Sequence, residues 1–376
     1  MKYLTYDLYD DFTCIGGECP DTCCASWNIP VDDSTAAYYR SLNTPFGQKL
    51  RDNLITDSQS NTLIKLHDGL CPFLTEDRLC QIYRELGEDR MCDTCTFYPR
   101  FHWTYGDLTF RGLNLSCPEF ARTLLLRRDT IQFHYSEDSL PSSDGATDWT
   151  LFNTLVSGMT RSIELMQNRS LCLSDRMRLL LIFNDSLTRH LDEGTDCTPL
   201  FPVFAPEHAD DLAARLAAVP KNHADKLSFF LNFGRNLEKF SPTTLRNLHS
   251  LLAFDSSYSA DEMNHFLAQC DTPEYQMQWE QYSVYFLSCF YMEASQTRNP
   301  RKCIAVFAYL YCLGFYFSAL SAAEKKHPPT IPEQAEILSK LARTFEHSGG
   351  MQFDTLYAVS EAGGFAETSA LLALLC

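Results

Sequence analysis

Nine of the sixteen cysteines lie between positions 14 and 117, in less than a third of the 376-residue chain. Thiols gathered at this density serve either disulfides or soft metals, and the redox state of the compartment usually decides which. We expect the N-terminal part of the chain to form a cysteine-ligated metal or cluster domain. The nine are Cys14, Cys19, Cys23, Cys24, Cys71, Cys80, Cys92, Cys95 and Cys117.

The N-terminus and the net charge bear on compartment and partners. Residues Met1 to Asp7 lack the apolar segment of a secretory signal, which favours the cytoplasm and metal ligation over disulfides. The formal net charge of −17 repels phosphate backbones, so the composition disfavours a nucleic-acid partner. The same charge favours the approach of a basic protein surface.

Three of the nine cysteines precede proline, at Cys19, Cys71 and Cys117. Proline biases the residue before it towards extended or turn geometry, so these thiols are expected on loops that converge on one centre. One ligand of the bacterial ferredoxin motif also precedes proline. Four thiolates make one zinc site or one [4Fe–4S] cluster and eight make two, so the spacing leaves zinc and iron–sulfur open.

Two local patterns refine this prediction. Cys23 and Cys24 are adjacent, and in an extended chain their side chains would point to opposite faces, which predicts different roles for them. Cys19 and Cys23 fit the start of the radical S-adenosylmethionine pattern Cys-x3-Cys-x2-Cys, but its third position is Ser26, which argues against the standard form of that chemistry. Cys92-x2-Cys95 also fits a thiol-redox pair.

The fold is predicted to be mainly α. Residues 1–135 are read as an irregular, cysteine-rich metal-binding domain, with a helix from the Asp32 cap to about Asn53 and a hairpin at 103–110 around Gly106-Asp107. Residues 136–148 are read as a linker. Residues 149–376 form an all-α domain, with caps expected at Ser174, Ser241 and Ser259. Its helices are expected at 149–167, 175–192, 207–218, 224–238, 242–254, 260–269, 274–296, 301–323, 332–347 and 365–375.

The stretch from Cys303 to Ala323 carries no charge. Its length would admit a membrane span. It carries several tyrosines and serines and continues a helical region, so we predict a buried central helix and no membrane association.

Four blocks of residues resemble the flagellin lysine-N-methylase family. They are Phe12-Thr-Cys14 with Cys19-Pro-Asp-Thr-Cys23-Cys24-x2-Trp27, then Cys71-Pro-Phe-Leu74 with Cys80 and Leu86-Gly-Glu88, then Cys92-x-Thr94-Cys95-x2-Tyr98-Pro-Arg100, and finally Leu115-Ser-Cys117-Pro-Glu119. The resemblance covers about the first third of the chain. It implies methyl transfer from S-adenosylmethionine to surface lysines of flagellin, with a [4Fe–4S] cluster in the enzyme, and favours iron–sulfur over zinc.

Two routes for that reaction stay open. An iron of the cluster not held by cysteine would bind S-adenosylmethionine directly, or a thiolate of Cys23 or Cys24 would carry the methyl group. Either route needs a neutral lysine amine and hence a base or an aromatic pocket. Tyr98 and Glu119 are the first candidates.

Further residues are assigned provisional roles. Asp21 and His102 are further candidates for the base, and Arg100 is a candidate clamp for the cofactor carboxylate, with a structural salt bridge as its alternative. Trp27 is expected to pack beside the cluster and shield it from water. A non-catalytic zinc-binding module with a helical partner-docking domain is the alternative function. No glycine-rich loop after a strand, as in Rossmann-type methyltransferases, is visible.

Overall fold

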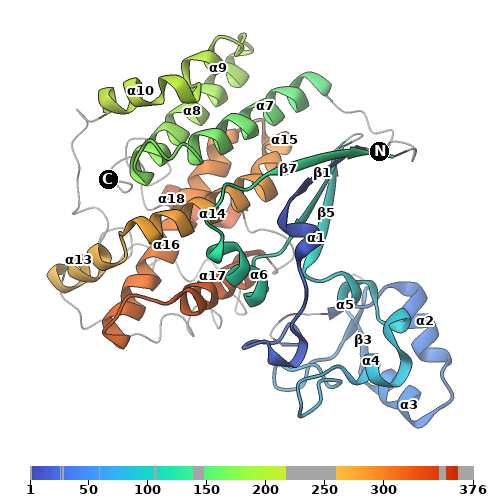
Figure 1. The fold of residues 1–376 in the computed structure, drawn as a ribbon. Coiled ribbons are helices and arrows are strands. Elements are labelled where there is room, and N and C mark those ends of the chain that lie inside the picture. Colours follow the sequence, from blue (N-terminus) through green and yellow to red (C-terminus); the bar gives the residue numbers. More distant parts are fainter. Residues whose placement is uncertain are drawn as a thin grey trace.

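A computed structural model describes residues 2–25, 27, 29–58, 60–105, 108–138, 148–216, 260–346 and 353–362. Figure 1 shows a large helical body, a smaller lobe that carries α2 to α5, and a sheet beside the body. The N-terminal elements are β1 (Lys2–Tyr6), α1 (Leu8–Asp11), η1 (Gly16–Glu18), β2 (Ile29–Pro30), α2 (Asp33–Ser41), α3 (Pro45–Asp52), β3 (Leu54–Thr56), β4 (Thr62–Ile64), α4 (Gln81–Leu86), η2 (Glu88–Arg90), α5 (Asp93–Phe97), β5 (Arg100–Tyr105), β6 (Leu108–Leu113), α6 (Pro118–Leu126) and β7 (Phe133–Glu137).

The helical body confirms most of the predicted helices. Its elements are α7 (Trp149–Met166), α8 (Leu173–Glu193), α9 (Leu200–Val203), η3 (Pro206–His208), α10 (Ala209–Leu216), α13 (Ala260–Gln269), α14 (Pro273–Phe290), η5 (Tyr291–Glu293), α15 (Ala294–Thr297), α16 (Pro300–Lys325), α17 (Ile331–Glu346) and α18 (Phe353–Ala362). The helices expected at 224–238, 242–254 and 365–375, and the caps at Ser241 and Ser259, lie outside the described residues. The cap expected at Ser174 is wrong, because α8 begins two residues earlier with Cys172 at its N-cap.

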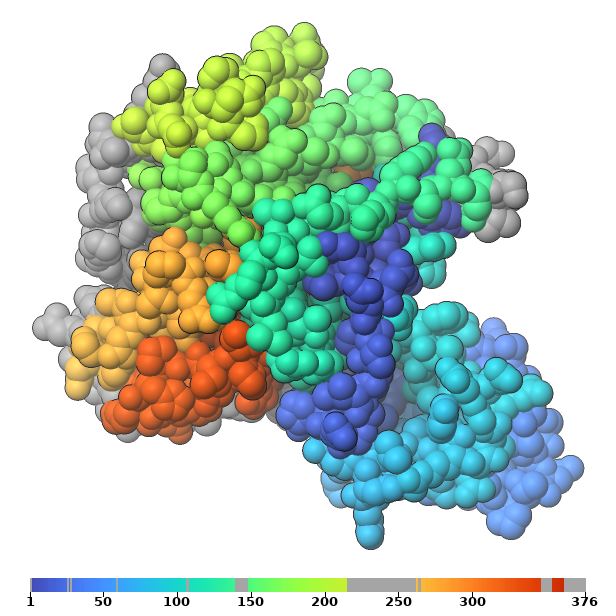
Figure 2. All heavy atoms as spheres, viewed as in Figure 1, coloured from blue at the N-terminus to red at the C-terminus, as the bar shows by residue number. Residues whose placement is uncertain are grey.

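A four-stranded sheet has the order β5-β6-β1-β7. The predicted hairpin is confirmed as the antiparallel pair β5–β6, with its turn residues 106–107 outside the described part. The rest of the sheet was not predicted: β1 runs parallel to β6, with Lys2 opposite Leu108, and antiparallel to β7. The N-terminal segment runs from this sheet to the smaller lobe (Figure 2). Residues 139–147 of the predicted linker are not described, so the domain boundaries stay a prediction.

The smaller lobe holds a second sheet of order β2-β4-β3. The Asp32 cap is confirmed, because its carboxylate accepts a hydrogen bond from the backbone N–H of Thr35 at 2.9 Å. The single helix to Asn53 is wrong. The chain leaves the helix at Leu42, and Pro45 starts α3, with Thr44 capping it. Proline favours the first turn of a helix and restricts the residue before it to extended geometry, so the break follows from Pro45.

Three apolar cores stabilise the described residues, and the smallest of them packs α8 against Phe204 and Ala209. The largest core joins the inner face of the four-stranded sheet and α6 to the helices of the body, through Phe110, Phe120 and Tyr285. The second core lies in the lobe around Tyr39 and Phe73, and it includes Cys71 and Cys92. The sheet and the helices therefore share one core, while the lobe has its own.

Helix α16 lies in the largest core, as predicted. Among the described residues it is the one helix long and apolar enough to cross a membrane, but 83% of its most apolar window is buried within the protein. At Gly314 the indole of Trp279 comes so close that an added Cβ would lie 2.7 Å from its nearest ring carbon.

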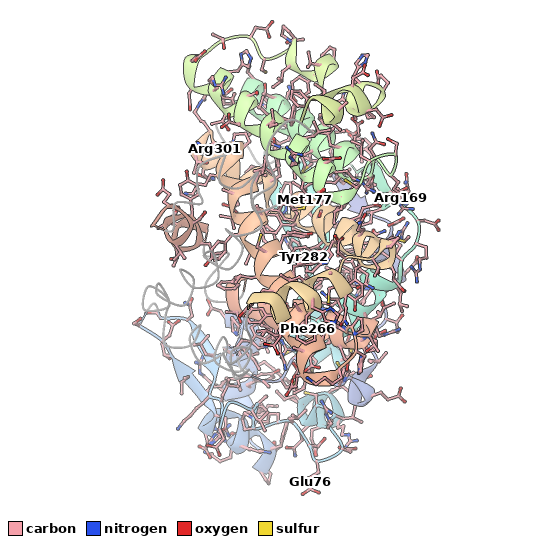
Figure 3. The ribbon with its side chains drawn as sticks, turned by 90° about the vertical axis from the view of Figure 1, so that its left-hand side faces the viewer. Glu76, Arg169, Met177, Phe266, Tyr282 and Arg301 are labelled. Carbon is pink, nitrogen blue, oxygen red and sulfur yellow. The ribbon has the colours of Figure 1, made fainter. Side chains whose placement is uncertain are left out.

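A buried ion triad connects α14 to α8 and the turn before it. Glu280 is 1% exposed. It accepts hydrogen bonds from Arg176 at 2.7 Å and from Arg169 at 2.8 Å. In Figure 3, Arg169 and Met177 mark this side of the body, and Glu76 marks the far end of the lobe. Removal of any one of these three groups would leave a buried charge without its partner and would destabilise the fold.

Candidate functional site

The nine N-terminal cysteines form two groups. Cys14, Cys19, Cys23 and Cys117 influence one another electrostatically, and we call them the pocket-side thiols. Cys24, Cys71, Cys80, Cys92 and Cys95 do the same within the smaller lobe, and we call them the lobe thiols. All nine are free thiols.

Burial disfavours the ionisation of two pocket-side thiols, Cys117 and Cys19. It raises the pKa of Cys117 to about 11, and the neighbouring Cys19 and Cys14 add to the effect. It also raises the pKa of Cys19, again with a contribution from Cys14. Cys117 is the N-cap residue of α6, so that helix fixes its position. Neighbouring thiols in this group thus disfavour the ionisation of Cys19 and Cys117.

Burial also raises the pKa of thiols in the smaller lobe, where a different set of loops carries them. Burial raises the pKa of Cys71 to about 12, with Cys24, Cys80 and Cys92 adding to it. The backbone joins two of these loops directly, because the Cys71 N–H donates to the Cys24 carbonyl at 2.8 Å. Cys92 and Cys95 share a hydrogen bond that lowers the pKa of the first and raises that of the second.

Cys23 and Cys24 are the point where the two groups meet. They lie in a turn, not in an extended segment, and their thiols form a hydrogen bond, so the expectation that they point apart is wrong. This bond, followed by burial, raises the pKa of Cys23 well above its ordinary value, and it lowers the pKa of Cys24 to about 7. The further neighbours of each still differ, so the predicted difference in role stays a prediction.

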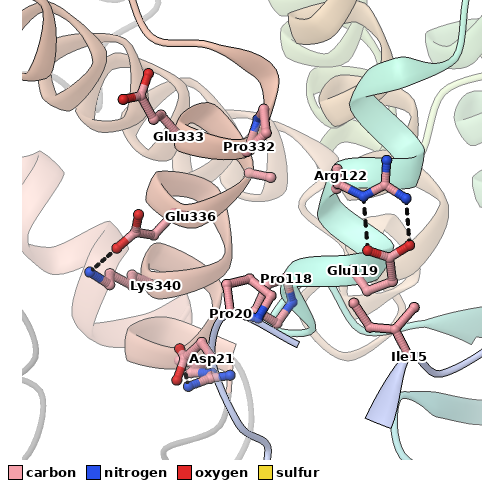
Figure 4. Close-up of a pocket in the computed structure, with 12 residues that line it drawn as sticks. Ile15, Pro20, Asp21, Pro118, Glu119, Arg122, Pro332, Glu333, Glu336 and Lys340 are labelled. Atoms are coloured by element: carbon pink, nitrogen blue, oxygen red, sulfur yellow. Dashed lines mark hydrogen bonds and ion pairs between the residues drawn. The ribbon is translucent and has the colours of Figure 1, made fainter. Parts of the chain in front are cut away.

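A cavity of about 660 Å³ adjoins the pocket-side thiols. Its walls are the cysteine loop of residues 15–21, the first turn of α6 and one face of α17 (Figure 4). This size falls in the range that accommodates small ligands and side chains. We call it the pocket. Its lining residues are Ile15, Pro20, Asp21, Pro118, Glu119, Arg122, Pro332, Glu333, Ala335, Glu336, Lys340 and Arg343.

The carboxylates of the pocket all have cationic partners. Glu119 accepts two hydrogen bonds from Arg122. Glu336 pairs with Lys340 at 2.6 Å, in an exposed part of α17. Partial burial works to raise the pKa of Glu333, but hydrogen bonds from Lys325 and Thr330 lower it to about 2. Charged side chains therefore line both the α6 wall and the α17 wall of the cavity.

Arg343 of α17 connects the helical body to the loops of the pocket-side thiols. Its Nη1 donates to Asp21 Oδ2 at 2.6 Å, and its Nε donates to the Ser116 carbonyl at 3.1 Å. Asp21 lies between Cys19 and Cys23, and Ser116 precedes Cys117. One guanidinium therefore holds together loops that are far apart in sequence. Its Nη2 is buried and has no partner among the described residues.

Trp27 and Tyr98 stack next to the same thiols. Their ring centroids are 5.5 Å apart, and the indole N–H of Trp27 donates to the Cys23 carbonyl at 2.6 Å. Burial raises the pKa of Tyr98, and Cys117 adds to the effect. The structure thus places Trp27, Tyr98, Asp21 and Glu119 around the pocket-side thiols. Their roles stay predictions.

Two other candidate residues lie elsewhere. Arg100 donates to the carbonyls of Tyr9 and Phe12 and stacks on both of their rings. His102 is exposed on β5. Neither lines the pocket. Their predicted roles in cofactor binding and proton transfer stay predictions.

The thiols can be tested for their fit to a metal centre. Within the described residues, no three His, Cys, Asp or Glu side chains have the geometry to hold a single metal ion. Zinc would need such a set, whereas the sulfide and iron atoms of a cluster keep its cysteines further apart. Each group supplies at least four thiols, and burial opposes the ionisation of Cys19 and Cys117 in one group and of Cys71 and Cys80 in the other. A bound cation reverses that opposition, so the donor set fits a thiolate-ligated cluster.

Sequence reasoning missed the residues that α17 contributes to the pocket. Glu336, Lys340 and Arg343 read as the charged face of an ordinary amphipathic helix. Nothing in their spacing indicates that this face lies against α6 and the cysteine loop. Only the uneven charge along α17, whose Arg343 lies among apolar neighbours, gave a weak indication.

The fold and the site define a mainly helical protein with two thiol groups and a charged pocket between its N-terminal loops and a late helix. The family described as "FliB lysine N-methylase C-terminal domain" matches residues 160–374, more than half of the chain. The chain belongs to the FliB lysine N-methylase family, which confirms the resemblance found in its cysteine blocks.

Curated relatives support the same assignment. The flagellar biosynthetic protein FliU of Salmonella muenchen is 37% identical over 120 residues, which cover 30% of this chain and 71% of that protein. Lysine-N-methylases of Salmonella typhimurium and Salmonella choleraesuis are 37% identical over 120 residues, which cover 30% of this chain and 30% of their own length. The match thus spans under a third of those two proteins. No solved structure matches this chain.

Proposed function

We propose that this protein transfers methyl groups from S-adenosylmethionine to lysine side chains of flagellin, and that its N-terminal thiols hold a [4Fe–4S] cluster. The observation that carries the proposal is a pocket whose lining includes Pro20 and Pro118, which directly follow the pocket-side thiols Cys19 and Cys117, in a chain of the lysine N-methylase family. The names of its relatives support lysine as the methylated residue and a flagellar protein as the substrate.

The pocket-side thiols would hold the cluster nearest to the pocket. When bound, such a cluster supplies an electron-poor iron that can attract the amino and carboxylate groups of S-adenosylmethionine. The protein's own residues do the rest. Trp27 and Tyr98 pack against each other next to Cys23 and Cys117 and would limit the access of water from that side. Glu119 and Asp21 face the pocket, where a carboxylate can hold or accept a proton of a lysine ammonium before the amine attacks.

Metal analysis tests the cluster. Protein purified without oxygen is expected to be brown and to contain iron and sulfide in equal amounts. Cys19→Ser and Cys117→Ser are expected to lower the iron content, whereas Cys172→Ser, at an exposed cysteine outside both groups, leaves it unchanged. A colourless protein with stoichiometric zinc and no sulfide would refute the cluster.

Mass spectrometry tests the activity. Incubation of the anaerobic protein with flagellin and S-adenosylmethionine is expected to add mass to flagellin in steps of one methyl group, located on lysines by peptide mapping. A reaction without S-adenosylmethionine is the control. Flagellin that keeps its mass, with protein that retains iron and sulfide, contradicts the proposed methyl transfer.

A further inference from the structure

The pocket has a lining suited to one particular side chain. We propose that it receives the target lysine, which meets Glu336 at the exposed end, lays its alkyl stem against Ile15, Pro20 and Pro118, and places its ammonium at Glu119. This inference rests on the proposed function and adds the place and the residues that select the substrate. Figure 4 shows Glu336 on α17 and Glu119 on α6 on opposite walls, with the prolines between them.

The apolar part of the lining suits an aliphatic chain. Pro20, Pro118 and Pro332 present ring carbons and have no backbone N–H to leave unpaired, and Ile15 and Ala335 add further carbon surface. None of the twelve described lining residues is aromatic. A flat ring such as a nucleobase would therefore find no aromatic ring to stack on among these residues, whereas the four methylene groups of lysine need none.

The exposed end of the pocket can exchange cations at little cost. Glu336 and Lys340 form an intrahelical pair whose side chains are 55% and 37% exposed. Such pairs contribute little to stability, because water and salt screen them. An incoming ammonium can replace Lys340 beside Glu336 without breaking a strong interaction. This makes Glu336 the first carboxylate that a substrate lysine meets.

The inner end holds a more firmly placed carboxylate. The Glu119 side chain is 11% exposed and bound to Arg122 through both oxygens, at 2.8 and 2.6 Å. A carboxylate has about four acceptor positions, so Glu119 can accept a further N–H while it keeps Arg122. Its position in the first turn of α6, directly after Cys117 and Pro118, places the bound nitrogen near the pocket-side thiols.

The lining also distinguishes lysine from arginine. The pocket already contains the guanidinium groups of Arg122 and Arg343, which occupy the bidentate positions of Glu119 and a 2.6 Å contact to Asp21. A third planar guanidinium would have to compete for those carboxylate edges. A compact ammonium with three donors needs only single oxygen contacts. The pocket is therefore expected to prefer lysine.

A binding assay tests the inference apart from catalysis. Dye-labelled glycine–serine peptides with one central lysine, norleucine or arginine are titrated with the whole protein, and binding is followed by fluorescence anisotropy. Norleucine keeps the stem and removes the charge. The protein variants are Glu336→Gln and Glu119→Gln. Glu164→Gln is the matched control, because Glu164 forms a similar exposed intrahelical pair with Arg161 on α7, outside the pocket.

The lysine peptide is expected to bind about tenfold more tightly than the norleucine peptide, because one charge-assisted hydrogen bond contributes a binding free energy of that size. Glu336→Gln and Glu119→Gln are each expected to weaken lysine binding about three- to tenfold and to leave norleucine binding unchanged. Equal binding of the two peptides, no binding of either, or an equal loss in Glu164→Gln would overturn the inference. Thermal unfolding of each variant shows that it is folded.

Methylation of flagellin separates this inference from the proposed function. Selective lysine binding that depends on both carboxylates, without methyl transfer, supports the pocket and refutes the reaction. Methyl transfer that is unchanged in Glu336→Gln and Glu119→Gln supports the reaction and overturns the pocket as the lysine site.

Discussion

Replacing Arg343 by alanine is expected to loosen the pocket-side thiols from the helical body. The variant loses the hydrogen bond to the Ser116 carbonyl, and a buried hydrogen bond from a charged group contributes roughly 1.5–3 kcal/mol. It also loses the ion pair with Asp21, which we reduce to about 1 kcal/mol because the Asp21 side chain is 35% exposed. The free energy of unfolding should fall by about 2–4 kcal/mol.

Urea unfolding of the two single variants and the double variant measures this effect. Asp21→Asn should cost about 1 kcal/mol, and the cycle with Arg343→Ala should give a coupling energy of similar size. Alkylation of metal-free protein with iodoacetamide, followed by peptide mapping, should show Cys19 and Cys117 reacting faster in Arg343→Ala, with Cys71 unchanged. A variant with native stability and native reactivity at both cysteines refutes the argument.

Three further predictions concern stability. Glu280→Gln leaves Arg176 buried without its counter-charge, and urea unfolding should show a loss of roughly 3–5 kcal/mol; a loss below about 1 contradicts the triad. Gly314→Ala forces a Cβ to within 2.7 Å of Trp279 and should cost about 1–3 kcal/mol, while an unchanged midpoint would show that the two helices can separate freely. Glu333 has its pKa lowered to about 2, so its contribution is complete above the ordinary carboxyl pKa and is lost as the pH falls towards 2. The stability gap between the native protein and Glu333→Gln should be constant from about pH 7 to 5 and narrow below about 4; a gap that widens with acid contradicts this assignment.

The sequence predicted those helices and strands that are determined by residues close to one another in the chain. Apolar residues at helical spacing located α7, α14 and α16, because the residues that a helix buries recur within its own sequence. The hairpin β5–β6 was predicted for a similar reason, since both strands flank one turn. The cysteine blocks located the thiol groups and the family, because a motif of this kind is visible in the sequence whatever the fold around it.

The remaining features depend on distant partners and carry no local pattern. Strand β1 is short, and its neighbours β6 and β7 come more than a hundred residues later. The division of the thiols into two groups does not follow sequence order, since Cys117 joins Cys14 and the adjacent Cys23 and Cys24 have different neighbours. The wall that α17 gives the pocket arises from its packing on α6, which the spacing of its charges does not reveal.

The central position of β1 has a consequence for how the protein forms during synthesis. The hydroxyl of Tyr6 bonds to the backbone of Leu113, 107 residues later in the chain. Closing such a long loop is slow, and the first strand has to wait on the ribosome until β6 has emerged. Cys117 follows β6 by only a few residues. The lobe thiols, by contrast, are complete at Cys95 and can gather earlier. A nascent chain is therefore expected to gather its two thiol groups in sequence, with the group next to the pocket completed last.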